Sequence, residues 1–127
     1  MIVDDSIVRG NTSRRIIDMA KEAGAKQVFF ASSAPPIIHP NVYGIDMPAR
    51  AEYVAHDRSI GQIAEAIGAD WLIYQELDDL VEACLDGGKD KPANFDCSCF
   101  DGVYVTGGIT EEYLSRVESA RNDAAKT

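Results

Sequence analysis

The chain has 127 residues, of which 46% are hydrophobic, and its formal net charge is −9. This length and composition are typical of one compact domain and exclude a collagen, a disulfide scaffold and a disordered protein. No apolar run approaches the ~20 residues that span a bilayer, and the first residues lack the pattern of a secretory signal. The acidic balance also disfavours nucleic acid and anionic membranes as partners. We therefore expect a cytoplasmic protein that binds neither.

Short apolar runs alternate with helical patterns in the first part of the chain. Met1 to Val3 is predicted to end a strand, and Thr12 to Ala23 to form a helix that stops at Gly24. Gln27 to Ala31 is the next predicted strand, because its β-prone apolar residues run together as in a buried parallel strand. Asn41 to Ile45 is a further candidate strand.

The same alternation continues towards the C-terminus. Ser59 to Ile67 is predicted to be a helix, with a capping box of Ser59 and Gln62 at its start and Gly68 at its end. Trp71 to Tyr74 is predicted to be a strand. The apolar residues that follow it have the spacing of an amphipathic helix that ends near Gly87 and Gly88: Leu77, Leu80, Val81 and Cys84.

The last third of the chain carries weaker signals. Gly88 to Asn94 is predicted to be an exposed loop, and Val103 to Thr106 a short strand or a turn. Thr110 is predicted to cap a final helix that runs towards Arg121. Strands that alternate with helices imply a single α/β domain with a mainly parallel sheet flanked by helices.

The cysteines and histidines give no strong indication of a metal site. Cys84 is predicted to lie in the core, and Cys97 with Cys99 forms a C-x-C pair that lacks the four-ligand spacing of a zinc or iron–sulfur site. We interpret all three as reduced thiols. His39 and His56 stand beside loop signals, and we expect both at the surface.

The segment from Asp4 to Ser13 carries the clearest functional pattern. Ligands of open α/β sheets bind outside the carboxyl ends of the strands, and Asp4 and Asp5 fall at such an end. The loop that follows leads into the start of a helix, where unpaired N–H groups and the helix dipole favour an anion. Gly10 permits a tight backbone path, and Thr12 adds a hydroxyl donor. The loop is therefore suited to a phosphate.

The two acids repel a phosphate but suit its far side. Carboxylates accept hydrogen bonds from sugar hydroxyls and bind hard cations such as Mg²⁺, so the pattern is compatible with a ribose phosphate. An acid pair after a strand is also often only a turn, and Thr12 could be a plain N-cap, so that interpretation stays open. Neither a G-x-x-x-x-G-K-[ST] nor a G-x-G-x-x-G phosphate loop is present.

The segment IVDDSIVRGNTS resembles the phosphoribosyl-pyrophosphate (PRPP) loop of the type I phosphoribosyltransferases, most closely the loop of the glutamine-using amidophosphoribosyltransferases. Other segments resemble the C-terminal part of the same family, in the same order, so that the resemblance covers nearly the whole chain. These segments are KEAGAKQVFFASSAPP at 21–36, PNVYGIDMP at 40–48, IGADWLIYQELDDLVEA at 67–83 and CFDGVYVTGGIT at 99–110.

The resemblance implies roles for the residues of this loop. Asp4 and Asp5 match the acid pair that contacts the ribose hydroxyls and the Mg²⁺ of bound PRPP. Family members commonly carry Thr where this chain has Asn11, which keeps the capacity to form hydrogen bonds. The residues that match the part of the loop that binds the 5′-phosphate are Ser6, Ile7, Val8, Arg9, Gly10, Asn11, Thr12 and Ser13.

The resemblance also implies what the chain is part of. Residues 1–127 match the C-terminal portion of a phosphoribosyltransferase domain, and we expect the N-terminal glutaminase domain and the first half of the transferase domain to be absent. The implied ligands are PRPP, purine nucleotides and Mg²⁺, without an iron–sulfur cluster. We expect the isolated chain to be inactive, and to form homo-oligomers through an exposed strand edge.

Two other interpretations compete with the enzyme. The chain could be a stand-alone PRPP- or nucleotide-binding regulatory module of the same family. It could also be a receiver-like signalling domain, but the sequence around Asp46 and Asp70 does not supply the required phosphoacceptor and lysine convincingly.

Overall fold

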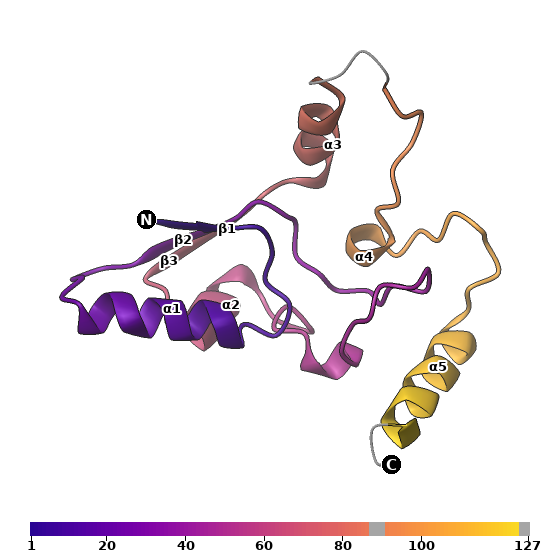
Figure 1. Cartoon of the computed structure of the whole chain (residues 1–127), viewed down its shortest axis with the longest axis horizontal. Helices are drawn as coiled ribbons and strands as arrows, with labels where there is room; N and C mark the ends of the chain where they lie inside the picture. The colour runs from indigo at the N-terminus through magenta and orange to yellow at the C-terminus, as the bar shows by residue number, and fades with distance from the viewer. Residues whose placement is uncertain (87–90, 125–127) are drawn as a thin grey trace.

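A computed structural model describes residues 1–86 and 91–124 and shows an α/β fold built on a small parallel sheet. The strands are β1 (Ile2–Asp4), β2 (Phe29–Ser32) and β3 (Trp71–Tyr74), paired side by side in that order (Figure 1). Their register is parallel throughout, with Ile2 beside Phe30 and Phe30 beside Leu72. The predicted mainly parallel α/β architecture is thereby confirmed.

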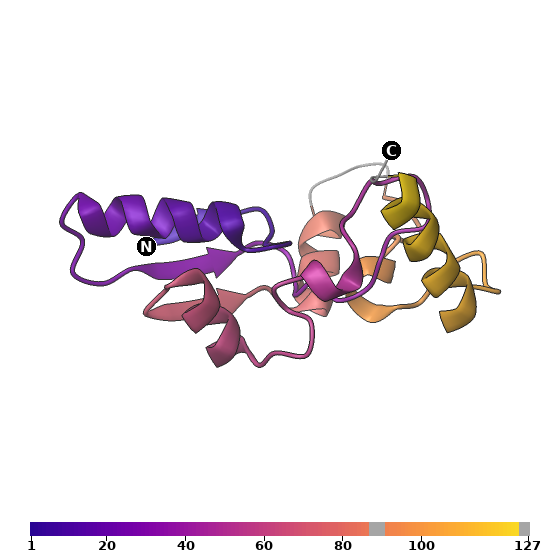
Figure 2. The ribbon, with the colours of Figure 1, turned by 90° about the horizontal axis from the view of Figure 1, so that it is seen from below.

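Two helices cover one face of this sheet. Helices α1 (Asn11–Glu22) and α2 (Ile60–Ile67) lie next to each other beneath the strands (Figures 1 and 2). Ile17 of α1 and Ile63 of α2 are fully buried against Phe30 of β2. This layer forms the hydrophobic core.

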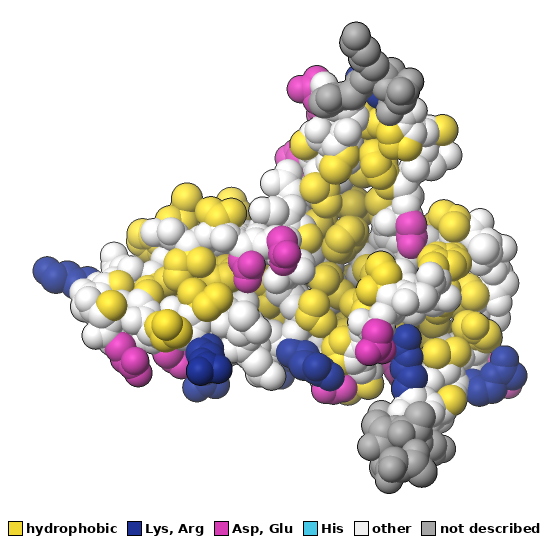
Figure 3. Space-filling model, in the orientation of Figure 1, with side chains coloured by type: hydrophobic (Ala, Val, Ile, Leu, Met, Phe, Trp, Pro, Cys, Tyr) yellow, Lys and Arg dark blue, Asp and Glu magenta, His cyan; other side chains and the backbone are white. Residues whose placement is uncertain are grey.

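The opposite face of the sheet is bare in the described structure. Val3 is 63% exposed and Trp71 53% exposed, and Ile73 and Phe29 are also exposed on this side. Hydrophobic side chains accordingly gather over the sheet at the surface of the molecule (Figure 3). Sheets in α/β folds usually carry helices on both faces, so this surface is unusual for the class.

The remaining helices lie beyond the carboxyl ends of the strands (Figure 1). The C-terminal helix is attached to the rest of the molecule through Arg50, which contacts Glu111 and Glu118 of that helix. Leu114 of the same helix is buried. These helices are the 3-10 helix η1 (Arg50–Glu52), α3 (Leu77–Asp86), α4 (Ser98–Asp101) and α5 (Glu111–Ala124).

The local signals for helix ends are confirmed. The Ser59 hydroxyl accepts a hydrogen bond from the Gln62 backbone N–H at 3.3 Å, and the Gln62 side chain accepts one from the Ser59 N–H at 2.8 Å. Gly68 ends α2 with φ +79°, and Thr110 caps α5 by accepting from the Tyr113 N–H at 3.2 Å. Gly24 follows the end of α1 with φ +103°.

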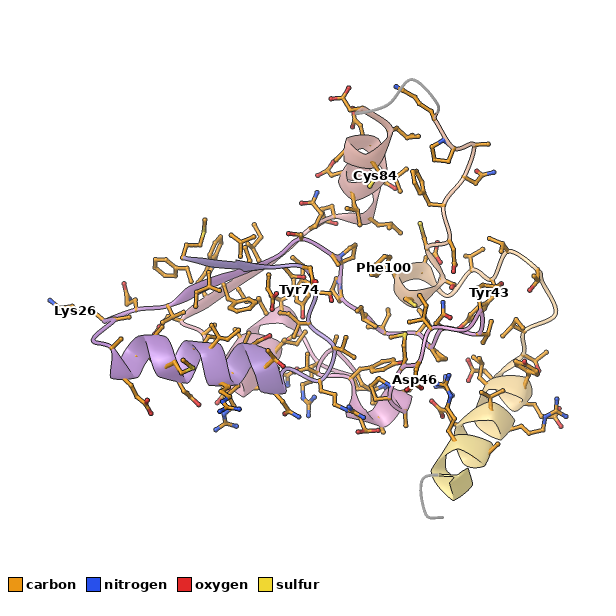
Figure 4. All side chains as sticks on the ribbon, in the orientation of Figure 1. Lys26, Tyr43, Asp46, Tyr74, Cys84 and Phe100 are labelled. Carbon is orange, nitrogen blue, oxygen red and sulfur yellow. The ribbon has the colours of Figure 1, made fainter. Side chains whose placement is uncertain are left out.

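Several other predictions are wrong. Asn41 to Ile45 is not a strand, because the buried Asn41 side chain accepts hydrogen bonds from the N–H groups of Tyr43 and Ile45 and holds the chain in a turn. Cys84 lies on α3 (Figure 4) and is exposed rather than in the core. His39 is half-buried rather than at the open surface, whereas His56, whose side chain is 42% exposed, lies at the surface as predicted.

The predictions for the last third of the chain have mixed outcomes. Val103 to Thr106 is part of a turn and not a strand, since the Gly107 N–H donates to the Tyr104 carbonyl oxygen at 2.9 Å. The predicted end of a helix at Gly87 and Gly88, and the start of the predicted loop from Gly88 to Asn94, lie outside the described residues; residues 91–94 form neither helix nor strand. None of the helices in the described ranges is both long and apolar enough to cross a bilayer.

Candidate functional site

The loop that joins β1 to α1 encloses the candidate site. A cavity of about 400 Å³ opens where β1 ends, and nearly all the residues predicted from the sequence line it. The exception is Ile7, whose side chain is 1% exposed and belongs to the hydrophobic core. The lining residues are Asp4, Asp5, Ser6, Val8, Arg9, Gly10, Asn11, Thr12 and Ser13.

The backbone of this loop is fixed from behind. Gly10 has φ +79°, and a Cβ atom built on it would lie 3.0 Å from Ile67 Cγ2 and 3.1 Å from Val54 Cγ2. Glycine alone combines this left-handed conformation with such close packing. The Val8 carbonyl oxygen also accepts a hydrogen bond from the Val54 N–H at 2.8 Å. The loop is therefore held in one shape by α2 and by the segment that contains Val54.

The start of α1 presents free donors to the cavity. Gly10 is the N-cap residue, so Thr12 is not the plain N-cap that the alternative interpretation required. No side chain caps this end and no acid stands in the first turn, so the first N–H groups of the helix, from Asn11 onward, have no partner within the helix. These donors and the positive end of the helix dipole favour an anion at this position.

The two acids stand at the beginning of the same loop, where β1 ends. Asp4 Oδ1 accepts a hydrogen bond from the Asp5 N–H at 3.0 Å, and Asp5 Oδ1 accepts one from the Ser6 hydroxyl at 3.1 Å. Asp5 is exposed and Asp4 is half-buried. Within the described ranges, no group of three or more His, Cys, Asp and Glu side chains could hold a metal ion. A cation at the acid pair would therefore need further ligands from a bound molecule or from water.

The sequence analysis missed one residue that contacts the lining of this cavity. Glu52 of η1 accepts a hydrogen bond from Arg9 Nε at 2.9 Å, and this bond is the main reason why the pKa of the Glu52 carboxyl lies below its usual value. The two residues are far apart in the sequence, and no local pattern around Glu52 indicates the pairing.

The C-x-C pair takes no part in this site. Cys99 Sγ contacts Met47 Sδ at 3.7 Å, and burial raises the pKa of the Cys99 thiol. Burial also raises the pKa of Cys97. A raised pKa keeps a thiol protonated and unreactive at neutral pH, which agrees with the interpretation of both cysteines as reduced thiols.

The sequence is similar to curated amidophosphoribosyltransferases over almost its full length, although no family model matches it. It is 60% identical to the Pseudomonas aeruginosa enzyme over 126 residues, which are 99% of this chain and 25% of that protein. The Escherichia coli enzyme is 53% identical over 126 residues, again 99% of this chain and 25% of the relative. The chain thus spans about a quarter of the length of the relatives it matches.

Solved structures lead to the same family. The Bacillus subtilis glutamine PRPP amidotransferase complexed with ADP and GMP has a TM-score of 0.75 at 40% identity, and the match covers 91% of this chain and 26% of that one. A structure described as the allosteric regulatory enzyme of purine biosynthesis has a TM-score of 0.76 at 40% identity, over 92% of this chain and 25% of that one. By sequence and by structure, the chain is therefore related to one segment of the amidophosphoribosyltransferases and has part of their type I phosphoribosyltransferase fold.

Proposed function

We propose that the loop from Asp4 to Ser13 is the PRPP site of an amidophosphoribosyltransferase. Such an enzyme joins ammonia released from glutamine to C1 of PRPP, with loss of pyrophosphate, and forms 5-phosphoribosylamine for purine synthesis. The observation that carries the proposal is a single cavity that is lined both by an uncapped helix start and by two carboxylates. These opposite charges match the two ends of a ribose 5-phosphate.

Different groups of the cavity would bind the phosphate and the ribose of the ligand. The N–H groups at the start of α1 and the hydroxyls of Thr12 and Ser13 would hold the 5′-phosphate. Asp4 and Asp5 would accept hydrogen bonds from the ribose hydroxyls, since ionised carboxylates are acceptors only. The reverse orientation would set a phosphate against two negative charges and is disfavoured.

The acid pair fits a magnesium ion that is shared with the ligand. Mg²⁺ is usually bound by one or two carboxylates and completes its octahedral shell with phosphate oxygens and water. Asp4 and Asp5 can supply these carboxylates, and the ion would neutralise charge on the ligand when it is bound. Because the described residues hold no larger acidic cluster, binding of the metal should depend on the ligand.

The contribution of this chain to the reaction is positioning and electrostatic stabilisation. No residue of the cavity is assigned as a general acid or base; fixed donors and charges act where the ribose and its leaving group are held. We propose that residues 1–127 are the C-terminal portion of the transferase domain, and that other segments of the longer protein cover the bare face of the sheet. The isolated chain should then bind ribose phosphates weakly and show no amidotransferase activity.

Purine nucleotides are a second ligand class for the same loop. The solved relative from Bacillus subtilis is complexed with ADP and GMP. GMP contains the same ribose 5-phosphate unit that the cavity suits, so we propose that GMP competes with ribose 5-phosphate for this loop.

Calorimetric titration of the chain with ribose 5-phosphate, with and without Mg²⁺, tests the assignment. Changing both Asp4→Asn and Asp5→Asn should weaken binding at least about tenfold and abolish its dependence on Mg²⁺. A matched control is the other pair of adjacent aspartates, Asp78→Asn with Asp79→Asn on α3, which should leave affinity unchanged. Equal affinity of the wild type and the loop variant would contradict the proposed site.

A further inference from the structure

Arg9 is the one positively charged side chain among the described residues that line the loop cavity. Its Nε–H donates to Glu52 Oε2 at 2.9 Å. The other oxygen of the same carboxylate, Oε1, accepts a hydrogen bond from the Ala49 N–H at 3.2 Å. One oxygen of the Glu52 carboxylate is thus bound at the start of its own 3-10 helix, and the other oxygen is bound to Arg9.

The helix η1 that carries Glu52 is itself firmly supported. Glu118 accepts hydrogen bonds from the N–H of Arg50 at 2.9 Å and from its Nε at 3.3 Å, and Glu111 accepts from Nη1 of Arg50 at 2.8 Å. Two residues after Glu52, the Val54 N–H donates to the carbonyl oxygen of Val8 in the loop. Glu52 therefore stands on a segment that is anchored both to α5 and to the loop.

The contact between Glu52 and Arg9 leaves the outer edge of the guanidinium group open. Only Nε is engaged by Glu52, and the two terminal NH₂ groups of Arg9 make no hydrogen bond to any other described residue. These two groups form one edge of a planar fork that matches the oxygens of a phosphate. An arginine side chain has large rotational freedom, so a fixed Nε removes much of the entropy that it would lose on binding an anion.

We propose that Glu52 is a positioning residue for the anion loop: it holds Arg9 by Nε so that its terminal NH₂ groups face the phosphate of the bound ligand. This inference rests on the proposed function of the loop and adds to it a residue that lies outside the loop. The opposing possibility is that Glu52 only neutralises Arg9 and repels the ligand. The side chains of Arg9 and Glu52 are 50% and 48% exposed, so water and salt screen the charge of Glu52, whereas the orientation of Arg9 depends on the direct bond.

The two possibilities predict opposite effects of removing Glu52. With positioning, Glu52→Ala weakens the binding of ribose 5-phosphate several-fold, although it removes a negative charge near an anion site. Glu52→Gln keeps an oxygen that can accept from Arg9 Nε, so it should restore most of the affinity. In an Arg9→Ala background, Glu52→Ala should have no further effect. Glu82→Ala, an exposed carboxylate on α3, is the control for the loss of one charge and should match the wild type.

Calorimetric titrations of these variants, with circular dichroism to verify the fold, decide the question. Affinity of Glu52→Ala equal to or tighter than that of the wild type overturns the positioning role, and so does an equal loss in the Arg9→Ala background. A wild-type chain that binds no ribose 5-phosphate overturns the proposed function together with this inference. Wild-type binding with an unaffected Glu52→Ala variant overturns the role of Glu52 alone.

Discussion

Asp70 and Val28 form a reciprocal pair of hydrogen bonds at the starts of two adjacent strands. The Val28 N–H donates to Asp70 Oδ2 at 2.7 Å, and the Asp70 N–H donates to the Val28 carbonyl oxygen at 2.9 Å. We expect Asp70→Ala to lower the free energy of unfolding by about 1–2 kcal/mol, because the buried Val28 N–H loses a charged acceptor. Urea unfolding measures the change, and Asp70→Asn, which keeps one acceptor oxygen, should lose less. An Asn variant as unstable as the Ala variant would contradict this role.

Gly10 should tolerate no side chain. Gly10→Ala adds left-handed strain and brings a methyl group to 3.0 Å from Ile67 Cγ2, so the free energy of unfolding should fall by about 2–3 kcal/mol. Gly24→Ala is the matched control, since Gly24 has φ +103° but no atom within 4 Å of a built Cβ. The difference between the two variants isolates the effect of packing, and ribose 5-phosphate binding should fall in the Gly10 variant alone. Equal behaviour of both variants in urea unfolding would contradict the close packing of the loop.

Tyr74 should destabilise the protein through its hydroxyl group. That group is buried and has no hydrogen-bond partner in the described ranges, and burial raises the pKa of Tyr74 to about 12. Tyr74→Phe removes an unpaired polar group, so we expect it to stabilise the protein by about 1 kcal/mol near neutral pH. Tyr43→Phe is the control: the Tyr43 hydroxyl lies 3.1 Å from Thr106 Oγ1, so this variant should gain nothing. A Tyr74→Phe variant that is less stable than the wild type would show that the hydroxyl has a partner.

The same tyrosine predicts a loss of stability at alkaline pH. The pKa is raised from 10.0 in the unfolded chain to about 12 in the folded one, so the folded state retains its proton where the unfolded state loses it. Below pH 10.0 both states keep the proton and Tyr74 adds no pH dependence; as the pH rises from 10.0 to about 12 only the unfolded state loses the proton, so the free energy of unfolding falls across this range. Unfolding by urea at increasing pH should show a steeper loss for the wild type than for Tyr74→Phe. Parallel curves would refute the shift.

The ion pairs of Arg50 should control how firmly α5 is attached. Glu118→Ala removes the acceptor of both the Arg50 N–H and its Nε, and we expect amide hydrogen exchange along α5 to accelerate, with a loss of about 1–2 kcal/mol of stability. Glu112→Ala is the control, because Glu112 is exposed on the same helix and makes no ion pair within the described ranges. Unchanged exchange in the Glu118 variant would mean that the buried Leu114 is sufficient to hold the helix.

The bare face of the sheet should drive self-association of the isolated chain. Val3, Trp71 and Ile73 expose apolar side chains there, and β1 is an edge strand with a partner on one side only. We expect concentration-dependent oligomers in sedimentation velocity, and Val3→Thr with Ile73→Thr should shift the chain towards monomer because threonine keeps a high strand propensity. A wild-type chain that stays monomeric at all concentrations would contradict this prediction.

Local patterns in the sequence predicted the elements that local chemistry determines. Ser59, Gln62 and Gly68 carry the whole signal for the ends of α2, and each makes the expected contact. The position of the cavity followed from the acid pair at the end of a strand and from Gly10, because these residues determine the backbone of the loop themselves. Which ligand occupies it stays a prediction.

The features that the sequence analysis missed depend on contacts between distant residues. The apolar residues around Tyr43 fit a strand, but the side chain of Asn41 folds them into a turn. Cys84 fits an apolar helix face, yet no residue of α3 is buried, and Leu77, Leu80 and Val81 on that face are only partly buried. Glu52 reaches Arg9 only after the chain has folded, so no spacing rule could have found it.

The acid pair begins on the shortest strand of the sheet, which is also an edge strand, and this placement has a dynamic consequence. β1 has three residues and one neighbour, whereas β2 lies between two strands and β3, the other edge strand, has four residues, so β1 should fray most readily. Each such opening would carry Asp4 away from the start of α1 and dismantle the cavity. A ligand that contacts both Asp4 and the start of α1 would bind only while β1 is paired and would therefore stabilise this strand. Its apparent affinity would in turn be lower the more readily β1 separates from the sheet.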